Sequence, residues 1–379
     1  MEAKQERLWY IDNLRLMVIV FVVMHHLAVT YGSVGGSWYY TEQRHLDVLS
    51  TLWFAFYLSF QQAFFMGLLF LIAGYFAASG YDRRGFGGFL GERFGRLLVP
   101  SLVYMLVVTP FMIYVELGRR DALNRKMDFI HGFLGFLSGT GVMWFAVALF
   151  IFSAVYGIAR LRTRSAAPIS AHRGIEPSSL NAAVLIMIVA LCAFLIRIVQ
   201  PIGTDVLNMQ LCYFASYIVL FVVGILAFRN DLFARINYRA GKRWLICGIV
   251  LGLLTWLGLV IGVSAVPGGV AALRGGLSWE SALFSLWEAF VAVAMSAGLI
   301  AVFREKLNRQ SSLIKALSDD SFTVYMFHPP IIVAVALLFR PVAVLPIVKW
   351  ALLCILCVPL CFVAAHFVLR KIPLLKKVL

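Results

Sequence analysis

The chain has 379 residues, of which 62% are hydrophobic and only 13% are charged. Soluble domains carry about 25% charged residues, so this composition excludes a soluble globular protein and indicates an integral membrane protein. The formal net charge of +15 could point to nucleic acid, but the basic residues are distributed along the chain in the manner of a membrane topology. We therefore expect the lipid bilayer, and no nucleic acid, as a partner.

Apolar stretches long enough to cross about 30 Å of hydrocarbon predict an all-α, polytopic transmembrane bundle of about ten helices. The predicted helices lie near residues 11–31, 55–79, 97–115, 142–160, 180–200, 211–228, 244–264, 281–303, 321–339 and 346–369. Since no long stretch has the composition of a soluble domain, we expect one membrane domain over residues 1–379, without a fused extramembrane domain. Residues 161–179, rich in Ser, Pro and Ala, predict a short cytoplasmic linker.

Lys and Arg residues alternate between the two sides of the predicted bundle. They are concentrated before the first helix and after every second one, whereas the loops after the first, fifth, seventh and ninth helices carry one each: Arg44, Arg197, Arg274 and Arg340. The positive-inside rule then places both termini in the cytoplasm. The basic segment 116–141 departs from this alternation, and we interpret it as an amphipathic helix on the outer side or as a re-entrant third helix, favouring the first.

Two ionisable residues, Arg15 and His26, share one face of the first predicted helix. Eleven helical steps turn about 1,100°, so the two side chains lie on the same stripe about 16 Å apart. Such residues are costly inside a membrane span and need a partner or a function. Arg15 could extend to the headgroups, and His26 could form a hydrogen bond across the bundle or act as a general base.

Arg93 and Arg96 lie three residues apart in the loop predicted after the second helix. They point the same way on a helix and could bind a phosphate, although positive-inside topology explains them as well. His328 is predicted about two turns from the cytoplasmic end of its helix. It precedes Pro329 and Pro330, which kink the helix and free backbone carbonyls, and a histidine that packs at the kink is the alternative.

Two further residues are candidates with ordinary alternatives. Asp12, three residues before Arg15, could orient that side chain or act as the acidic residue typical of a helix N-terminus. Trp144 could anchor its helix at the membrane interface or form the wall of a cavity. The six cysteines all fall within predicted spans, where packing explains them, and no metal site is expected.

Four segments, residues 10–31, 64–100, 142–152 and 321–332, together resemble the acyltransferase type 3 family of membrane acyltransferases. The spacing of Arg15 and His26 matches the signature of that family in its first helix. The sequence FFMGLLFLIAGYF, followed by RFGRLLVP, resembles the second and third helices of the family, and VYMFHPP resembles its segment near the C-terminus. Without an attached esterase-like domain, the chain is most similar to the glucan-modifying branch.

The resemblance implies a multi-pass O-acyltransferase of the cytoplasmic (inner) membrane. It implies transfer of an acetyl or succinyl group from cytoplasmic acyl-CoA to a hydroxyl of an extracytoplasmic glycan or similar acceptor. In this interpretation Arg93 and Arg96 hold the coenzyme A phosphates, Arg15 guides the donor, His26 is the general base, and Glu116 is a contact for the acceptor. Acyl-CoA is then the donor substrate, and no permanently bound cofactor is expected.

Two other classes of function fit parts of the pattern. A proton-coupled secondary transporter could use His26 and His328 as an intramembrane relay, but it does not require the Arg pair together with Arg15. A structural or partner-binding bundle predicts that His26 can be replaced without consequence. Whether the bundle works alone or as a dimer is left open by the sequence.

Overall fold

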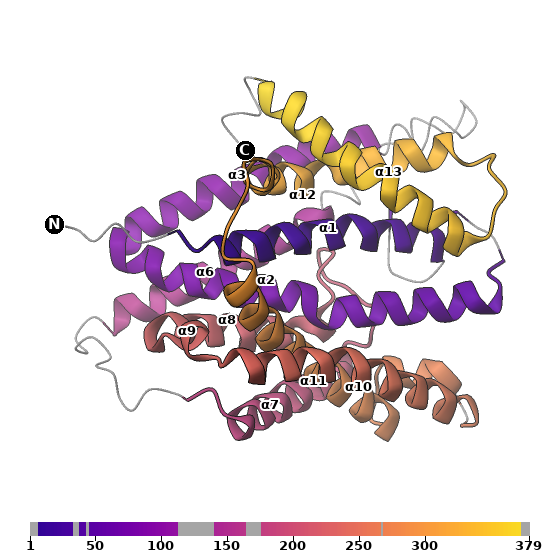
Figure 1. The fold of residues 1–379 in the computed structure, drawn as a ribbon, viewed down its shortest axis with the longest axis horizontal. Coiled ribbons are helices and arrows are strands. Elements are labelled where there is room, and N and C mark those ends of the chain that lie inside the picture. Colours follow the sequence, from indigo (N-terminus) through magenta and orange to yellow (C-terminus); the bar gives the residue numbers. More distant parts are fainter. Residues whose placement is uncertain are drawn as a thin grey trace.

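The computed structural model describes residues 7–32, 38–42, 45–112, 140–163, 176–266 and 268–372. Within these ranges the chain folds into helices joined by short connections, without a β-sheet. Figure 1 shows the long helices lying roughly side by side along the longest axis of the molecule. The prediction of an all-α, polytopic bundle is therefore confirmed.

Nine helical stretches of the described chain are long and apolar enough to cross a membrane. The longer helices are α1 (Trp9–Gly32), α2 (Val48–Arg93), α6 (Trp144–Arg162), α7 (Ser179–Val199), α8 (Phe214–Asn230), α10 (Tyr238–Ser264), α11 (Trp279–Lys306), α12 (Ser312–Leu338) and α13 (Pro346–Phe367). The shorter α3 (Val99–Val103) continues α2, and α9 (Leu232–Arg235) follows α8. These bounds match the predicted spans closely, except at the second, third, seventh and ninth predicted helices. The seventh begins at Tyr238, six residues before its predicted start.

The predicted loop between the second and third helices is wrong, because helical structure continues from Val48 to Met112. This run has 65 residues, which corresponds to about 100 Å of helix, far more than one crossing needs. The chain bends at Gly85, whose φ of 65° and ψ of −176° are open mainly to glycine. Figure 1 shows the two purple limbs meeting at one end of the molecule, so the run supplies two of the ten predicted crossings.

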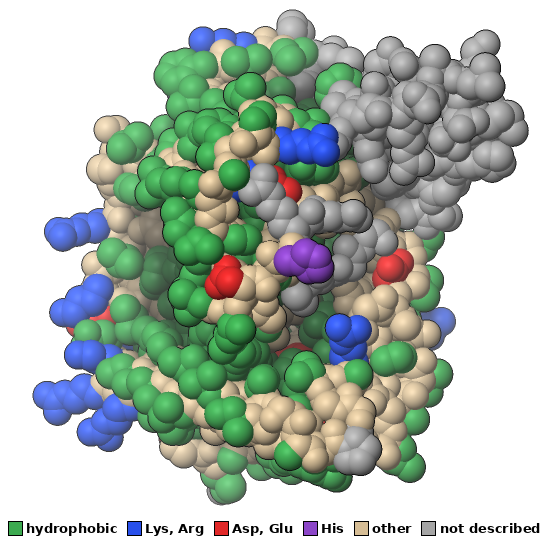
Figure 2. Space-filling model, turned by 90° about the vertical axis from the view of Figure 1, so that its right-hand side faces the viewer, with side chains coloured by type: hydrophobic (Ala, Val, Ile, Leu, Met, Phe, Trp, Pro, Cys, Tyr) green, Lys and Arg blue, Asp and Glu red, His purple; other side chains and the backbone are tan. Residues whose placement is uncertain are grey.

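Polar contacts bring the start of α1, the start of α12 and the end of α13 to one end of the bundle. Arg7 pairs with Asp319 at 3.4 Å, while His366 and Arg370 both pair with Asp320. The carbonyl of Leu307, just after α11, accepts a hydrogen bond from the Asn13 amide at 2.6 Å. We call this the basic end; Figure 2 shows the opposite end, where hydrophobic and uncharged groups make up most of the described surface in view.

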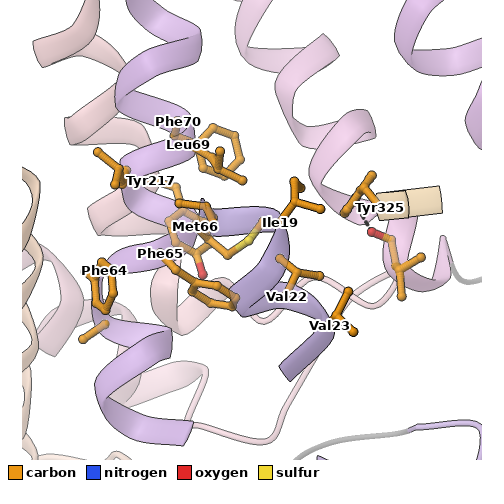
Figure 3. Packing of buried hydrophobic residues seen from close by; sticks show 14 of the residues in the cluster. Ile19, Val22, Val23, Phe64, Phe65, Met66, Leu69, Phe70, Tyr217 and Tyr325 are labelled. Carbon is orange, nitrogen blue, oxygen red and sulfur yellow. Dashed lines mark hydrogen bonds between the residues drawn. The ribbon is translucent and has the colours of Figure 1, made fainter. Parts of the chain in front are cut away.

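Helices α2 and α8 pack so closely that their glycines leave no room for a side chain. A Cβ at Gly74 would lie 2.0 Å from the Phe221 carbonyl oxygen, and one at Gly224 would lie 2.0 Å from the Leu71 carbonyl oxygen. Small residues permit such approach between transmembrane helices. On its other faces α2 packs against α1, α6 and α11, and Figure 3 shows its Phe65 and Met66 beside Val22 of α1.

The Gly224→Ala variant tests this crossing. The added methyl group meets backbone atoms, which cannot move aside as a flexible side chain can, so we expect a loss of about 1–3 kcal/mol in stability. Thermal unfolding of the purified protein in one detergent measures the effect. Gly87→Ala is the control, because a Cβ there has no atom within 4 Å, and equal melting temperatures for the two variants would contradict the close crossing.

Candidate active site

The two predicted site residues of the first helix lie on one uninterrupted helix, α1. Eleven residues of helical rise separate Arg15 from His26 by about 16 Å. The Arg15 side chain is 51% exposed, and His26 is partly exposed although it lies eighteen residues into a buried helix. Both ends of the stripe are therefore accessible within a helix that is otherwise packed against α2, α11, α12 and α13.

At the basic end, Asp12 interacts more closely with Arg7 than with Arg15. Its carboxylate accepts a hydrogen bond from Arg7 Nε at 2.8 Å and lies 3.8 Å from Arg15 Nη1. Asp12 also lies in the first turn of α1, where a carboxylate stabilises the helix dipole. The role of a carboxylate at a helix N-terminus thus accounts for Asp12, which lies farther from Arg15 than from Arg7.

Arg93 and Arg96 lie on the helical run after the Gly85 bend, close enough to Arg15 for the three positive charges to repel one another. The Arg93 guanidinium lies over the Phe89 ring, 5.4 Å from its centroid. Arg96 pairs with Glu92 at 3.4 Å but keeps 79% of its side chain exposed. Glu92 and Asp12 relieve part of this repulsion, and a bound anion would relieve more of it.

At the opposite end of the stripe, His26 meets His328 of α12. The Nε2 atom of His328 lies 3.0 Å from Nδ1 of His26, and their ring centroids are 4.8 Å apart. The two residues are 302 positions apart in the sequence. The structure therefore brings together the two intramembrane histidines that the sequence singled out separately.

The predicted depth of His328 is wrong. Helix α12 begins at Ser312, nine residues earlier than predicted, with the Ser311 side chain accepting a hydrogen bond from the backbone of Ile314. Serine is a preferred N-cap, and this cap was the signal in the sequence that would have placed the helix correctly. His328 therefore lies more than four turns from the start of α12 and reaches the level of His26.

Pro329 determines how the His328 ring is bonded. A proline has no N–H for the carbonyl four residues earlier, which here is the carbonyl of Tyr325. That free oxygen accepts a hydrogen bond from Nδ1 of His328 at 2.8 Å. Since a carbonyl can only accept, Nδ1 of the neutral ring carries the proton and Nε2 presents its lone pair to His26.

The proton of the neutral His26 ring is also assigned from its hydrogen-bond partners. Its Nδ1 lies 3.0 Å from the Val22 carbonyl and 3.0 Å from Nε2 of His328, and both of these atoms accept. Nδ1 of His26 therefore carries the proton and donates it to this pair of acceptors. Nε2 is left as the basic nitrogen, without a hydrogen-bond partner in the described part of the chain.

One residue that contacts the histidine pair was missed by the sequence analysis. Trp38, in the segment after α1, stacks on His26 with ring centroids 4.3 Å apart and an angle of 19° between the rings. Its indole N–H donates to Thr30 at 2.9 Å. A tryptophan outside a helix carries no periodic signal, so its position could be found only from the fold.

Trp144, a predicted site wall, lies in a neighbouring aromatic group rather than against His26. Its ring stacks on Tyr217 at a centroid distance of 5.7 Å, and Phe145 beside it reaches Tyr325 at 6.2 Å. The hydroxyl of Tyr325 donates to the Val142 carbonyl, a contact drawn in Figure 3. This group therefore fixes the start of α6 against the turn of α12 that precedes His328.

Other predictions fall outside the described residues. Glu116 and nearly all of the basic segment 116–141 belong to the range 113–139, and most of the linker 161–179 belongs to the range 164–175. At the edges of that linker, α6 extends to Arg162 and α7 begins at Ser179. Among the described residues, no group of three or more His, Cys, Asp or Glu side chains could hold a metal ion.

One comparison with known proteins identifies a family. Curated proteins and solved structures gave no match. A family model described as an acyltransferase domain matches residues 8–366. This range includes all of the predicted site residues: Asp12, Arg15, His26, Arg93, Arg96, Glu116, Trp144 and His328. Because the match covers nearly the whole chain, the protein belongs to the acyltransferase type 3 family of membrane acyltransferases.

Proposed function

We propose that this membrane acyltransferase moves an acyl group from cytoplasmic acyl-CoA to a hydroxyl of an extracytoplasmic glycan. The observation that carries the proposal is the α1 stripe, with Arg15 exposed among arginines at one end and the accessible base His26 at the other. In this proposal the basic end faces the cytoplasm, as the positive-inside rule requires, and the protein resides in the cytoplasmic (inner) membrane.

The donor fits the stripe in chemistry and in length. Coenzyme A carries phosphates at one end of a long flexible arm and the thioester at the other. Arg93 and Arg96 bind the phosphates, because a guanidinium forms charge-assisted hydrogen bonds with them. The arm extends past Arg15 along α1 and places the thioester near His26, a distance of about 16 Å.

The transfer step needs one base and no covalent intermediate. His26 Nε2 takes the proton of the acceptor hydroxyl as its oxygen attacks the thioester carbonyl carbon. The carbon–sulfur bond then breaks, and the proton passes from His26 to the departing thiolate. The products are an O-acyl ester and free coenzyme A, so the histidine returns to its starting state.

The proposal names the acceptor only by its chemical class. A hydroxyl reaching His26 from the side opposite the basic end accounts for a glycan outside the cytoplasm, and a glucan remains our prediction for its class. The acyl group is acetyl or succinyl.

Replacement of the base gives the first test. In liposomes with radiolabelled acetyl-CoA or succinyl-CoA and a panel of glucan and other oligosaccharides, we expect His26→Ala to lower acyl transfer at least about 100-fold. His45→Ala is the control, because this histidine is exposed and lies outside the helices. Transfer by His26→Ala at the wild-type rate would contradict the proposal. Solute uptake that depends on His26 without acyl transfer would support the transporter instead.

His328 gives the second test, because it holds His26 in the productive tautomer. His328→Phe removes one of the two acceptors of the Nδ1 proton and leaves only the Val22 carbonyl, and we expect transfer to fall about tenfold or more. His328→Gln keeps an acceptor oxygen in the side chain and should retain more activity than the Phe variant. Acetyl-CoA binding, measured on both variants, checks that they fold. Equal activity of the two variants would refute the tautomer argument.

The third test concerns the donor. Loss of a charge-assisted hydrogen bond weakens binding by about 1.5–3 kcal/mol, so we expect Arg15→Gln to raise the KM for acetyl-CoA about tenfold or more. The kcat should change less, since Arg15 lies far from the reacting atoms. Arg83→Gln is the matched control, as Arg83 is exposed near the bend of the same basic end. An unchanged KM in Arg15→Gln would remove Arg15 from the donor path.

A further inference from the structure

The indole ring of Trp38 lies nearly parallel to both imidazoles of the histidine pair and contacts that of His26. It stacks on His26 at 4.3 Å between ring centroids, with 19° between the planes. It also lies nearly parallel to His328, at 6.4 Å and 16°. Trp38 is only partly buried, and one face of its indole lies against the base.

Several contacts hold the indole in this position. Its N–H donates to Thr30 Oγ1 at 2.9 Å, and the Thr30 hydroxyl donates to the His26 carbonyl at 2.9 Å. Further along the segment, the Glu42 amide donates to the Thr30 carbonyl at 2.9 Å, and the Glu42 carboxylate pairs with buried Lys349 at 2.8 Å. The segment is thus bound to the last turns of α1 and to α13.

This placement matters when His26 carries a second proton. During transfer the ring becomes an imidazolium, and a cation close to the face of an indole is attracted to it, more strongly where water is excluded. The neutral ring gains less from the same contact. A stacked indole therefore favours the charged form, which exists only while the proton is held between the hydroxyl and the thiolate.

We propose that Trp38 is a positioning residue for acyl transfer, which stabilises protonated His26 and holds its ring with Nε2 directed to the acceptor. This proposal rests on the function proposed above for His26. It assigns a role to an aromatic ring that touches the base and is itself outside the transmembrane helices. Simple packing of a hydrophobic side chain is the competing explanation, and it predicts a loss of folding rather than a loss of turnover.

Kinetics with acetyl-CoA and an accepted oligosaccharide separate these explanations. We expect Trp38→Leu to lower kcat about tenfold, equivalent to about 1.4 kcal/mol, with the KM for acetyl-CoA within about twofold of wild type. Trp38→Phe keeps an aromatic face and should restore most of the activity. Thr30→Val removes the acceptor of the indole N–H and should give an intermediate kcat. Trp53→Leu is the control, since this tryptophan lies on α2 with 36% of its surface exposed.

A second measurement needs no acceptor. Diethyl pyrocarbonate modifies neutral imidazoles, and mass spectrometry reports the rate at each histidine. If the indole covers His26, its modification should be several-fold faster in Trp38→Leu than in wild type or Trp38→Phe. The exposed His45 serves as the internal reference.

The outcomes distinguish the two proposals. Wild-type transfer by His26→Ala would overturn the proposed function. Loss of transfer in His26→Ala, together with a wild-type kcat in Trp38→Leu, would overturn only the role of Trp38. An equal loss of kcat in Trp38→Leu and Trp38→Phe, or an unchanged modification rate at His26, would also overturn that role.

Discussion

The interior of a lipid bilayer offers no water to polar groups, and this constraint governs the arrangement of the helices. A buried charged side chain therefore needs a partner from another part of the chain. Arg197, which we expected in the loop after the fifth helix, lies instead within α7 and is fully buried. It pairs with Glu288 of α11, and its Nη1 donates to Ser285 at 2.9 Å. This contact fixes α7, most of whose other side chains face outward, against the core of the bundle.

The same constraint explains why the candidate active site is well defined. His26 and His328 satisfy each other across the α1 and α12 interface, and Glu42 and Lys349 do so near the far end of α1. Removing one partner of a buried ion pair is costly, so each such contact specifies which helices are neighbours. The site is thus formed by contacts that also determine the packing.

In the proposed reaction, helix α1 connects the end that binds the donor phosphates with the base. Its start is bound by hydrogen bonds to the chain between α11 and α12, and its other end is bound through Trp350 of α13, which donates to the Met24 carbonyl at 3.2 Å. A straight helix held at both ends keeps Arg15 and His26 at a constant separation. The proposed donor carries phosphates at one end and a thioester at the other. With the phosphates bound near Arg15, this separation would place the thioester at His26.

The hydrophobic pattern of the sequence was sufficient to predict most helices and the shared face of Arg15 and His26, because both depend on local periodicity. It failed where the ends of elements depend on polar residues. The charged first turns of α12 lower its mean hydropathy. The predicted helix therefore starts too late in the sequence, and His328 is predicted too near the cytoplasm. The helix around Arg93 was missed for the same reason. The stacking of Trp38 depends on a loop conformation, which periodicity does not describe.

The contact between two histidines 3.0 Å apart has one more consequence. Only one proton fits between the facing nitrogens, so protonating both of them would place two like charges in contact and force the rings of α1 and α12 apart.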